Sequence, residues 1–389
     1  MKENDIFTVT IFDEDNIGNG ICKIDNMIVF AKEGLKDDVL KIKIDSIKKR
    51  YANAHIEKII SPSKNRIISK CKYYNSCGGC SFLHTTYDYE REIKHKYIEK
   101  LFDRKIEYLP SKKEYNYRNK VTLHVKNGKV GLYNENTHDI CEINNCLLLH
   151  PLINEKIKEL KRFDLETISE IMIRAINNQI MISVKSSEDD INIKNIKCDC
   201  LYINDKHIKG KTYLTDEVGK FKFSIYPNAF YQVNKDTMIN LYNKAYELVG
   251  KSESLLDLYC GTGTIGIWLH DKFDKVTGVE INHAAIMNAT LNLKLNKINN
   301  IEFICNDAKN IIKKYKTIIV DPPRTGLSLN VLEHLNFFEA EEIVYISCNP
   351  NTLRRDIMGM NNYYIADMCC ADMFPRTKHL ECICLLKKK

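Results

Sequence analysis

The chain has 389 residues, 44% of them hydrophobic, and a formal net charge of +7. This length predicts two or three domains with a sizeable core. No apolar run approaches the roughly 18 residues of a membrane span, and the N-terminus lacks the basic and apolar regions of a signal peptide. We therefore expect a cytoplasmic protein without a membrane segment.

Positive charge is concentrated in one part of the chain. Residues 41–120 contain 20 lysines and arginines against 9 aspartates and glutamates, a local net charge of +11. Phosphate contacts from basic side chains supply most of the non-specific affinity of proteins for nucleic acids. The charge distribution therefore predicts a polyanionic partner.

Residues 1–60 alternate apolar and polar side chains in short runs. The runs lie at 6–11, 27–30, 39–44 and 54–59, with turns at Asn19-Gly20 and Glu33-Gly34 between them. Four or five short strands joined by tight turns predict a small β-barrel.

A group of cysteines follows the predicted barrel, in a chain that contains fifteen. Cys71, Cys77 and Cys80 are spaced as Cys-x5-Cys-Gly-Gly-Cys, a compact metal-ligand pattern that needs a fourth ligand. Thiolates serve zinc and iron–sulfur clusters equally well, so the ligand type leaves the metal open. A helical stretch and further strands with short helices continue to residue 221, which predicts an α+β central domain over 61–221.

From residue 222 onward, strand-like and helix-like segments alternate, as a parallel α/β sheet requires. One strand runs into Gly-x-Gly-x-x-Gly at 261–266, a turn that suits a dinucleotide or S-adenosylmethionine. Glu280, after the next strand, is placed to accept hydrogen bonds from ribose hydroxyls. Asp257 favours S-adenosylmethionine, because an acid at the first strand end suits a cationic amino-acid group. Asp307, after a third strand, is placed to meet the adenine edge.

Three further motifs follow the glycine turn. Asp321-Pro322-Pro323-Arg324 ends the fourth strand, and its prolines make the chain leave the sheet there. Cys348 ends a later strand, immediately before Asn-Pro and the start of a helix, a position that favours a thiolate. Glu381 precedes the last apolar strand. A thiolate and a carboxylate downstream of a methyl-donor site suit alkylation of a carbon that is not itself nucleophilic.

In this order the motifs resemble those of the RNA 5-methyluridine methyltransferase family. The likeness includes Phe-Pro-Arg-Thr-Lys-His-Leu-Glu at 374–381, in which Arg376 replaces a frequent histidine, a departure that we interpret as tolerated. The resemblance implies an α/β fold with a Rossmann-like class I methyltransferase domain over 222–389. It also implies an OB-like TRAM barrel over 1–60 and an RNA-binding, cluster-bearing central domain over 61–221.

The resemblance implies a reaction as well. Cys348 would add to C6 of an extruded uracil and Glu381 would remove the C5 proton, while Arg324 and Asp321 would orient the base. The residues expected to hold the methyl donor are Gln232, Tyr259, Glu280, Asp321, Asp257, Gly261 and Asp307.

The barrel and the cysteine motif together resemble the 23S rRNA branch of the family. This implies 23S rRNA as substrate and a structural [4Fe–4S] cluster on Cys71, Cys77, Cys80 and Cys146, with Cys141 as the alternative fourth ligand. We expect a monomer. Two alternatives stay open, an NAD-dependent oxidoreductase that uses the glycine turn and a non-catalytic RNA-binding iron–sulfur protein.

Overall fold

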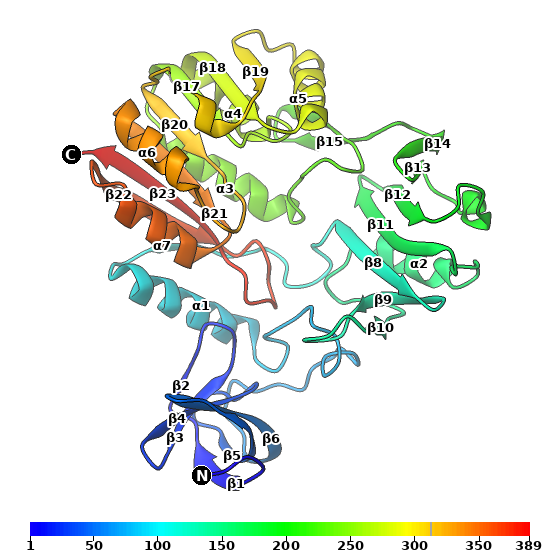
Figure 1. The fold of residues 1–389 in the computed structure, drawn as a ribbon, viewed down its shortest axis with the longest axis vertical. Helices are drawn as coiled ribbons and strands as arrows, with labels where there is room; N and C mark the ends of the chain where they lie inside the picture. The colour runs from blue at the N-terminus through cyan, green and yellow to red at the C-terminus, as the bar shows by residue number, and fades with distance from the viewer. Residues whose placement is uncertain (312) are drawn as a thin grey trace. The chain divides into compact units, whose positions relative to one another are not determined.

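The computed structural model describes residues 1–311 and 313–389 (Figure 1). The described chain divides into two compact units. Unit 1 comprises Met1–Lys105, Tyr133–His138 and Phe374–Lys378, and unit 2 comprises Ile106–Leu132, Asp139–Met373 and His379–Lys389. The units interleave along the chain, so the three domain boundaries expected from the sequence stay predictions. Among the described residues, no helix is both long and apolar enough to cross a membrane.

Unit 1 begins with a six-stranded barrel sheet in the order β1-β5-β6-β4-β3-β2. Its strands are β1 (Ile6–Thr10), β2 (Asp13–Glu14), β3 (Gly20–Ile24), β4 (Met27–Ala31), β5 (Val39–Ile47) and β6 (Tyr51–Ser61). β1 and β2 are separated by two residues, yet β1 pairs with β5 and β2 pairs with β3. One continuous segment thus forms both edges of the sheet and closes the barrel.

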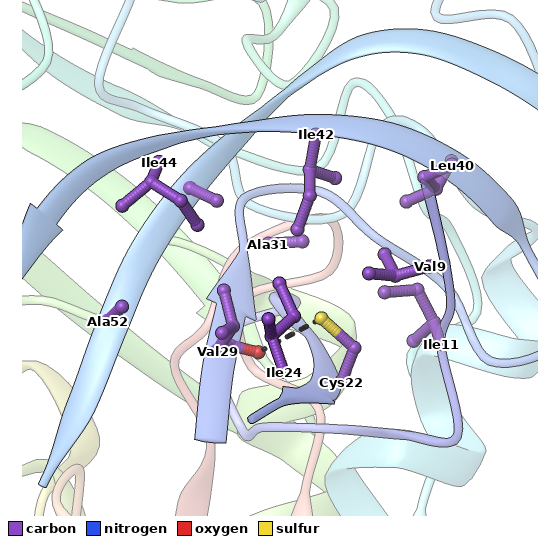
Figure 2. Close-up of a cluster of buried hydrophobic side chains, with 11 residues drawn as sticks. Val9, Ile11, Cys22, Ile24, Val29, Ala31, Leu40, Ile42, Ile44 and Ala52 are labelled. Carbon is purple, nitrogen blue, oxygen red and sulfur yellow. Dashed lines mark hydrogen bonds between the residues drawn. The ribbon is translucent and has the colours of Figure 1, made fainter. Parts of the chain in front are cut away.

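Alternate side chains of these strands fill the barrel, as the period-2 pattern predicts. Figure 2 shows Leu40, Ile42 and Val29 among the side chains gathered in this core, and all three are fully buried. The Cys22 thiol donates to the carbonyl oxygen of Val29 at 3.7 Å. This cysteine is therefore a small residue of the hydrophobic core.

The rest of unit 1 holds the cysteine loop and helix α1 (Tyr87–Phe102). Asp38, which is fully buried, joins this part to the barrel by accepting hydrogen bonds from Arg66 Nε at 3.1 Å and Ser63 N–H at 2.7 Å. α1 begins after Thr86, whose hydroxyl accepts a hydrogen bond from the backbone N–H of Tyr89. Such a cap satisfies one of the unpaired donors at a helix start.

Residues Phe374–Lys378, called the strap below, come from the far end of the chain and are anchored in unit 1 by Arg376. The buried Arg376 guanidinium lies 3.2 Å from the Glu90 carboxylate of α1 and donates to the carbonyl oxygen of Phe82 at 2.6 Å. Lys94 pairs with the same carboxylate at 2.7 Å. Buried charges need such pairing and hydrogen bonding. Arg376 is therefore a structural anchor, which is more than the tolerated replacement that the sequence suggested.

Unit 2 contains a seven-stranded sheet in the order β10-β9-β8-β11-β12-β13-β14. Its strands are β8 (Lys120–Lys126), β9 (Lys129–Tyr133), β10 (Ile140–Glu142), β11 (Ile168–Ile176), β12 (Gln179–Ser186), β13 (Cys200–Ile203) and β14 (Lys206–Gly210). Helix α2 (Pro151–Leu160) packs on β11, and the short turn η1 (Asn192–Asn195) precedes β13. A separate hairpin, β15 (Leu214–Val218) and β16 (Phe221–Ile225), follows the sheet.

The second large sheet of unit 2 has the order β19-β18-β17-β20-β21-β23-β22-β7. Its strands are β7 (Glu107–Leu109), β17 (Ser252–Leu258), β18 (Phe273–Glu280), β19 (Ile301–Cys305), β20 (Thr317–Val320), β21 (Glu342–Ser347), β22 (Tyr363–Ala371) and β23 (Glu381–Lys388). The helices between them are α3 (Lys235–Leu248), α4 (Thr264–Leu269), α5 (His283–Asn296), α6 (Leu329–Phe338) and α7 (Pro350–Gly359), with the turns η2 (His270–Lys272) and η3 (Ala308–Asn310). The parallel strands and intervening helices confirm the predicted Rossmann-like α/β fold.

Candidate active site

The ends of several strands meet at one edge of the eight-stranded sheet. β17, β18, β20 and β21 are parallel, so their carboxyl ends share an edge, and antiparallel β23 begins there. In open α/β sheets, ligands bind at this carboxyl edge. The structure thus brings together five residues that the sequence singled out, which are Asp257, Glu280, Asp321, Cys348 and Glu381.

The register between β21 and β23 makes Cys348 and Glu381 neighbours. The last ladder pair is Ser347 with Cys382. One further step places Cys348 opposite Glu381, and the Cβ atoms of directly opposed residues are about 4.5–5.5 Å apart on one face of the sheet. Consistent with this proximity, the Glu381 charge raises the pKa of the Cys348 thiol. The two residues predicted to be nucleophile and base therefore face the same space.

The charged side chains around Cys348 have opposite effects on the pKa of its thiol. Burial raises the pKa of this half-buried thiol, and the carboxylates of Glu381 and Asp321 raise it further. Arg324 lowers the pKa through its charge and a side-chain hydrogen bond. The Asn349 amide in turn donates to the carbonyl oxygen of Arg324 at 3.2 Å. Arg324 is thus held beside the thiol, where it favours the thiolate.

The two carboxyl groups at this edge are also coupled. Burial raises the pKa of Asp321 and of Glu381, which is 2% exposed. In Glu381 the Asp321 charge adds to this effect, whereas Arg324 opposes it. Two close carboxyl groups resist losing both protons. A carboxylate with a raised pKa is a stronger base once it has ionised.

The glycine turn after β17 is shaped by left-handed backbone angles. Tyr259 has φ +62°, Gly261 +52° and Gly263 +76°. A Cβ at Gly263 would lie 2.3 Å from the Phe303 ring, so only glycine fits there. The space beside Gly261 is open. The turn can therefore admit a ligand close to its backbone.

Asp257 is the residue that most strongly indicates a binding site for a cationic group at this turn. It is fully buried, and its Oδ2 accepts the N–H of Gly266 at 3.0 Å, while Oδ1 has no partner among the described residues. Burial raises the pKa of Asp257 to about 8, with further contributions from the charges of Asp321 and Glu280. A buried acceptor without a donor is unfavourable. The amino group of S-adenosylmethionine supplies both the missing donor and a positive charge, so these residues fit that cofactor.

Three further predicted residues, Glu280, Tyr259 and Asp307, adjoin the turn. The two oxygens of Glu280 accept backbone N–H groups of Gly261 at 3.2 Å and Asn282 at 2.9 Å, which fixes the carboxylate at the end of β18. Burial raises the pKa of Tyr259 to about 12, and the charges of Asp307 and Glu280 contribute. These three residues therefore lie within electrostatic reach of one another, where the ribose and adenine of the cofactor were expected.

Gln232 lies in the segment between β16 and α3. It is 6% exposed, and its backbone carbonyl accepts the Asn119 side-chain amide at 3.1 Å. Helix α3 lies against the site, because charges on Asp321 and Glu381 reach Tyr242 and contribute to its raised pKa, whose main cause is burial. The contact of Gln232 with the methyl donor stays a prediction. Sequence reasoning missed Tyr242, which looks like an ordinary core residue of an amphipathic helix.

Sequence reasoning also missed the hydrogen bonds that hold the backbone near Cys348, the predicted nucleophile. The Tyr345 hydroxyl donates to Asp356 Oδ2 at 2.6 Å, and the N–H of Leu327 donates to the same oxygen at 2.8 Å. Asp356 is 3% exposed and lies on α7, so it connects the strand before Cys348 to the loop after Asp321. The sequence signal that could have identified Asp356 is an acidic residue on the apolar face of a predicted helix.

The cysteine motif lies in unit 1, where Cys71, Cys77 and Cys80 are half-buried. The N–H of Cys77 donates to the carbonyl oxygen of Tyr73 at 2.7 Å, which folds the loop. Cys146 belongs to unit 2. Among the described residues, no three His, Cys, Asp or Glu side chains form a group suited to a metal ion. The thiol chemistry of these cysteines suits a cluster, and the cluster itself stays a prediction.

Comparison with known proteins identifies the family. The tRNA (Uracil-5-)-methyltransferase family model matches residues 169–316 and 308–389, more than half of the chain, and the TRAM domain model matches residues 2–56. The chain belongs to the tRNA (uracil-5-)-methyltransferase family. An uncharacterized RNA methyltransferase of Clostridium acetobutylicum is 33% identical, with 100% of this chain and 98% of the relative covered. One from Staphylococcus aureus is 30% identical, with 100% and 99% covered.

A solved structure of the family is similar along the whole chain. The Pyrococcus abyssi tRNA (uracil-54, C5)-methyltransferase, in complex with S-adenosyl-L-homocysteine, has a TM-score of 0.84 and 27% identity, covering 98% of this chain and 100% of that chain. Family membership decides for a methyltransferase and against an NAD-dependent oxidoreductase. The TRAM match confirms the expected barrel. The similarity covers 98% of this chain and so extends over the barrel, and the expected 23S rRNA substrate stays a prediction.

We predict that the charges around Cys348 set the pH at which its thiolate forms. Alkylation by iodoacetamide requires the thiolate, so its rate rises through the pKa of the thiol. Arg324→Gln removes a charge that lowers this pKa, and the midpoint should move to higher pH. Glu381→Gln removes a charge that raises it, and the midpoint should move to lower pH. Mass spectrometry of the Cys348 peptide measures both midpoints, and shifts of the same sign would contradict the prediction.

Proposed function

We propose that this enzyme methylates C5 of a uridine in RNA, with S-adenosylmethionine as methyl donor and a covalent bond between Cys348 and uracil C6 as intermediate. Family membership supports uracil-C5 chemistry on RNA. The observation that carries the mechanism is the strand register that sets Cys348 beside Glu381, at the same sheet edge as the glycine turn. Substitution at C5 needs a nucleophile and a base that face the same space.

The reaction begins with extrusion of the uridine, because C5 and C6 are not reachable within a base stack. The Cys348 thiolate adds to C6, and the π electrons of the C5–C6 bond move to C5 and O4. S-adenosylmethionine, when bound, would supply the methyl group that C5 takes, its S–CH3 bond breaking to leave the thioether S-adenosylhomocysteine. Glu381 then removes the C5 proton, the C5–C6 double bond re-forms, and the S–C6 bond breaks to release Cys348 as a thiolate.

The charges of the site suit both half-reactions. Arg324 favours the thiolate needed for addition. Burial and the Asp321 charge raise the pKa of Glu381, which strengthens it as a base for the C5 proton. Asp257 would accept a hydrogen bond from the amino group of the methyl donor, and Glu280 would accept hydrogen bonds from its ribose hydroxyls; their fixed carboxylates support these roles. Addition and elimination therefore use groups of opposite charge near the thiol.

Variants of Cys348 and Glu381 should distinguish the two proposed catalytic roles. Cys348→Ala should abolish methyl transfer and form no RNA adduct, because no atom adds to C6. Glu381→Gln should still permit addition and methylation, so a methylated adduct accumulates and multiple turnover falls by about 10²-fold or more. A denaturant-resistant protein–RNA band labelled from tritiated methyl donor measures this species.

Cys305→Ala is the matched control for this experiment, since Cys305 is an exposed cysteine at the end of β19 on the same sheet. It should turn over normally. Retained affinity for S-adenosylhomocysteine verifies that the Cys348 and Glu381 variants are folded. Appreciable turnover by Cys348→Ala would exclude it as nucleophile. Normal turnover by Glu381→Gln would place the base elsewhere, with Asp321 as the next candidate.

We propose a uridine of 23S rRNA as the first candidate substrate. It is supported by the resemblance of the Cys71–Cys80 motif to the 23S rRNA branch of the family. A tRNA uridine is the second candidate, and the full-length similarity to a tRNA enzyme favours it. Both candidates suit the basic stretch at residues 41–120.

Mapping of 5-methyluridine in a strain that lacks the gene distinguishes these substrates. We expect one or two uridines of 23S rRNA to lose the methyl group and to regain it with the wild-type gene but not with Cys348→Ala. A loss confined to tRNA would establish the second candidate. Unchanged methylation in both RNAs would favour the non-catalytic RNA-binding alternative.

We further propose that Cys71, Cys77, Cys80 and Cys146 hold a [4Fe–4S] cluster that stabilises the fold. The thiol donors and the family resemblance support this, and no step of the reaction uses the cluster. Protein purified anaerobically should contain roughly four irons per chain. Cys77→Ser should lose most of the iron, whereas Cys198→Ser, at a half-buried cysteine outside the motif, should retain it. Stoichiometric zinc, or no metal at all, would contradict the cluster.

We also propose that the enzyme acts as a monomer in the cytoplasm. The proposed RNA substrates support the location. Sedimentation velocity of the purified enzyme measures the oligomeric state.

A further inference from the structure

Three cations gather on one face of the seven-stranded sheet. Arg174 of β11 is directly opposite Lys120 of β8 in the antiparallel ladder, so both side chains emerge on the same face. Arg118, two residues before Lys120, donates from Nε to the carbonyl oxygen of Lys120 at 3.0 Å. Within the part of the chain that the structure describes, none of the three forms an ion pair. The nearby carboxylate of Glu170 is paired with Lys185 at 3.4 Å.

This arrangement is unfavourable in the free protein. Arg174 is fully buried, and its Nη2 donates to the carbonyl oxygen of Ala229 at 3.0 Å, while Nε and Nη1 have no acceptor among the described residues. Burial and the charges of Arg174 and Arg118 lower the pKa of half-buried Lys120 to about 8. Like charges directly opposite destabilise a sheet, and a buried cation without acceptors is costly. A bound anion relieves both effects.

The three cations adjoin the segment that carries Gln232. Arg174 holds the carbonyl of Ala229, and the Asn119 amide holds the carbonyl of Gln232 at 3.1 Å. Between these anchors, Phe230 is 68% exposed. The segment is thus fixed to the sheet that bears the cations, and it leads directly into α3 at the active site. An anion at Lys120 therefore binds beside the segment that carries Gln232.

We propose that Lys120 and Arg118 bind a backbone phosphate of the RNA substrate, with buried Arg174 supplying positive potential beneath them. The identity of this ligand rests on the proposed function, which makes RNA the substrate. A phosphodiester is the anion that RNA presents repeatedly, and ammonium and guanidinium groups are its usual partners. The site differs from the predicted methyl-donor residues at the edge of the other sheet, whereas Gln232 lies in the segment beside the cations.

The charge of Lys120 provides the test. In the full-length enzyme, Lys120→Gln should raise the Kd for substrate RNA about tenfold and should reduce the slope of log Kd against log salt by about one. Lys120→Arg keeps the charge and should restore binding. Affinity for S-adenosylhomocysteine should not change in either variant.

Lys126→Gln is the matched control. Lys126 lies on the same face of β8, but its ammonium is exposed and already paired with Asp139 at 3.0 Å, so the salt slope should stay at the wild-type value. An unchanged Kd and slope in Lys120→Gln would overturn the proposal. So would a loss of S-adenosylhomocysteine affinity at constant slope, which assigns the cations to the carboxylate of the methyl donor. Wild-type enzyme that neither binds nor methylates RNA would instead contradict the proposed function.

Discussion

The antiparallel insertion of β23 between β21 and β22 is the constraint on which the active site depends. Because β23 opposes its neighbour β21, its first residue, Glu381, arrives at the edge where β21 delivers Cys348. A parallel strand of the same length would begin at the other edge, about 20 Å away. A slip of one residue would turn the carboxylate to the opposite face. Long-range pairing, more than the local motifs, therefore brings the proposed nucleophile and base together.

The same edge concentrates negative charge. Asp257, Asp321 and Glu381 are all carboxyl groups whose pKa is raised by burial, and Arg324 is the cation placed among them. A methyl donor that carries an amino group and a sulfonium relieves this accumulation of like charge. Loss of the sulfonium charge on methyl transfer weakens that attraction. The electrostatics of the edge thus suit uptake of a cationic donor and release of the neutral thioether product.

The sequence predicted what depends on short stretches of chain. The alternation in residues 1–60 indicated the barrel, and strand ends followed by glycine or proline indicated Asp257 and Asp321, because both signals are local. Lys120 and Arg174 looked like separate cations of two strands, and only the register makes them neighbours. Arg376 could not be interpreted from its motif, because its partner Glu90 lies 286 residues away. Tertiary pairing of distant charges leaves no periodic signal in a single sequence.

The strap determines when unit 1 can complete its folding during synthesis. Synthesis proceeds from the N-terminus, and domains generally fold as units during it. Unit 1, however, buries the Glu90–Lys94 pair together with an arginine that is translated only near the end. Its final packing therefore waits until residue 376 has been made, five residues before the carboxylate that we propose as the base. A nascent chain that stops short of the strap lacks both the proposed base and the buried arginine that pairs with Glu90, so the proposed catalytic pair and the N-terminal unit are completed together.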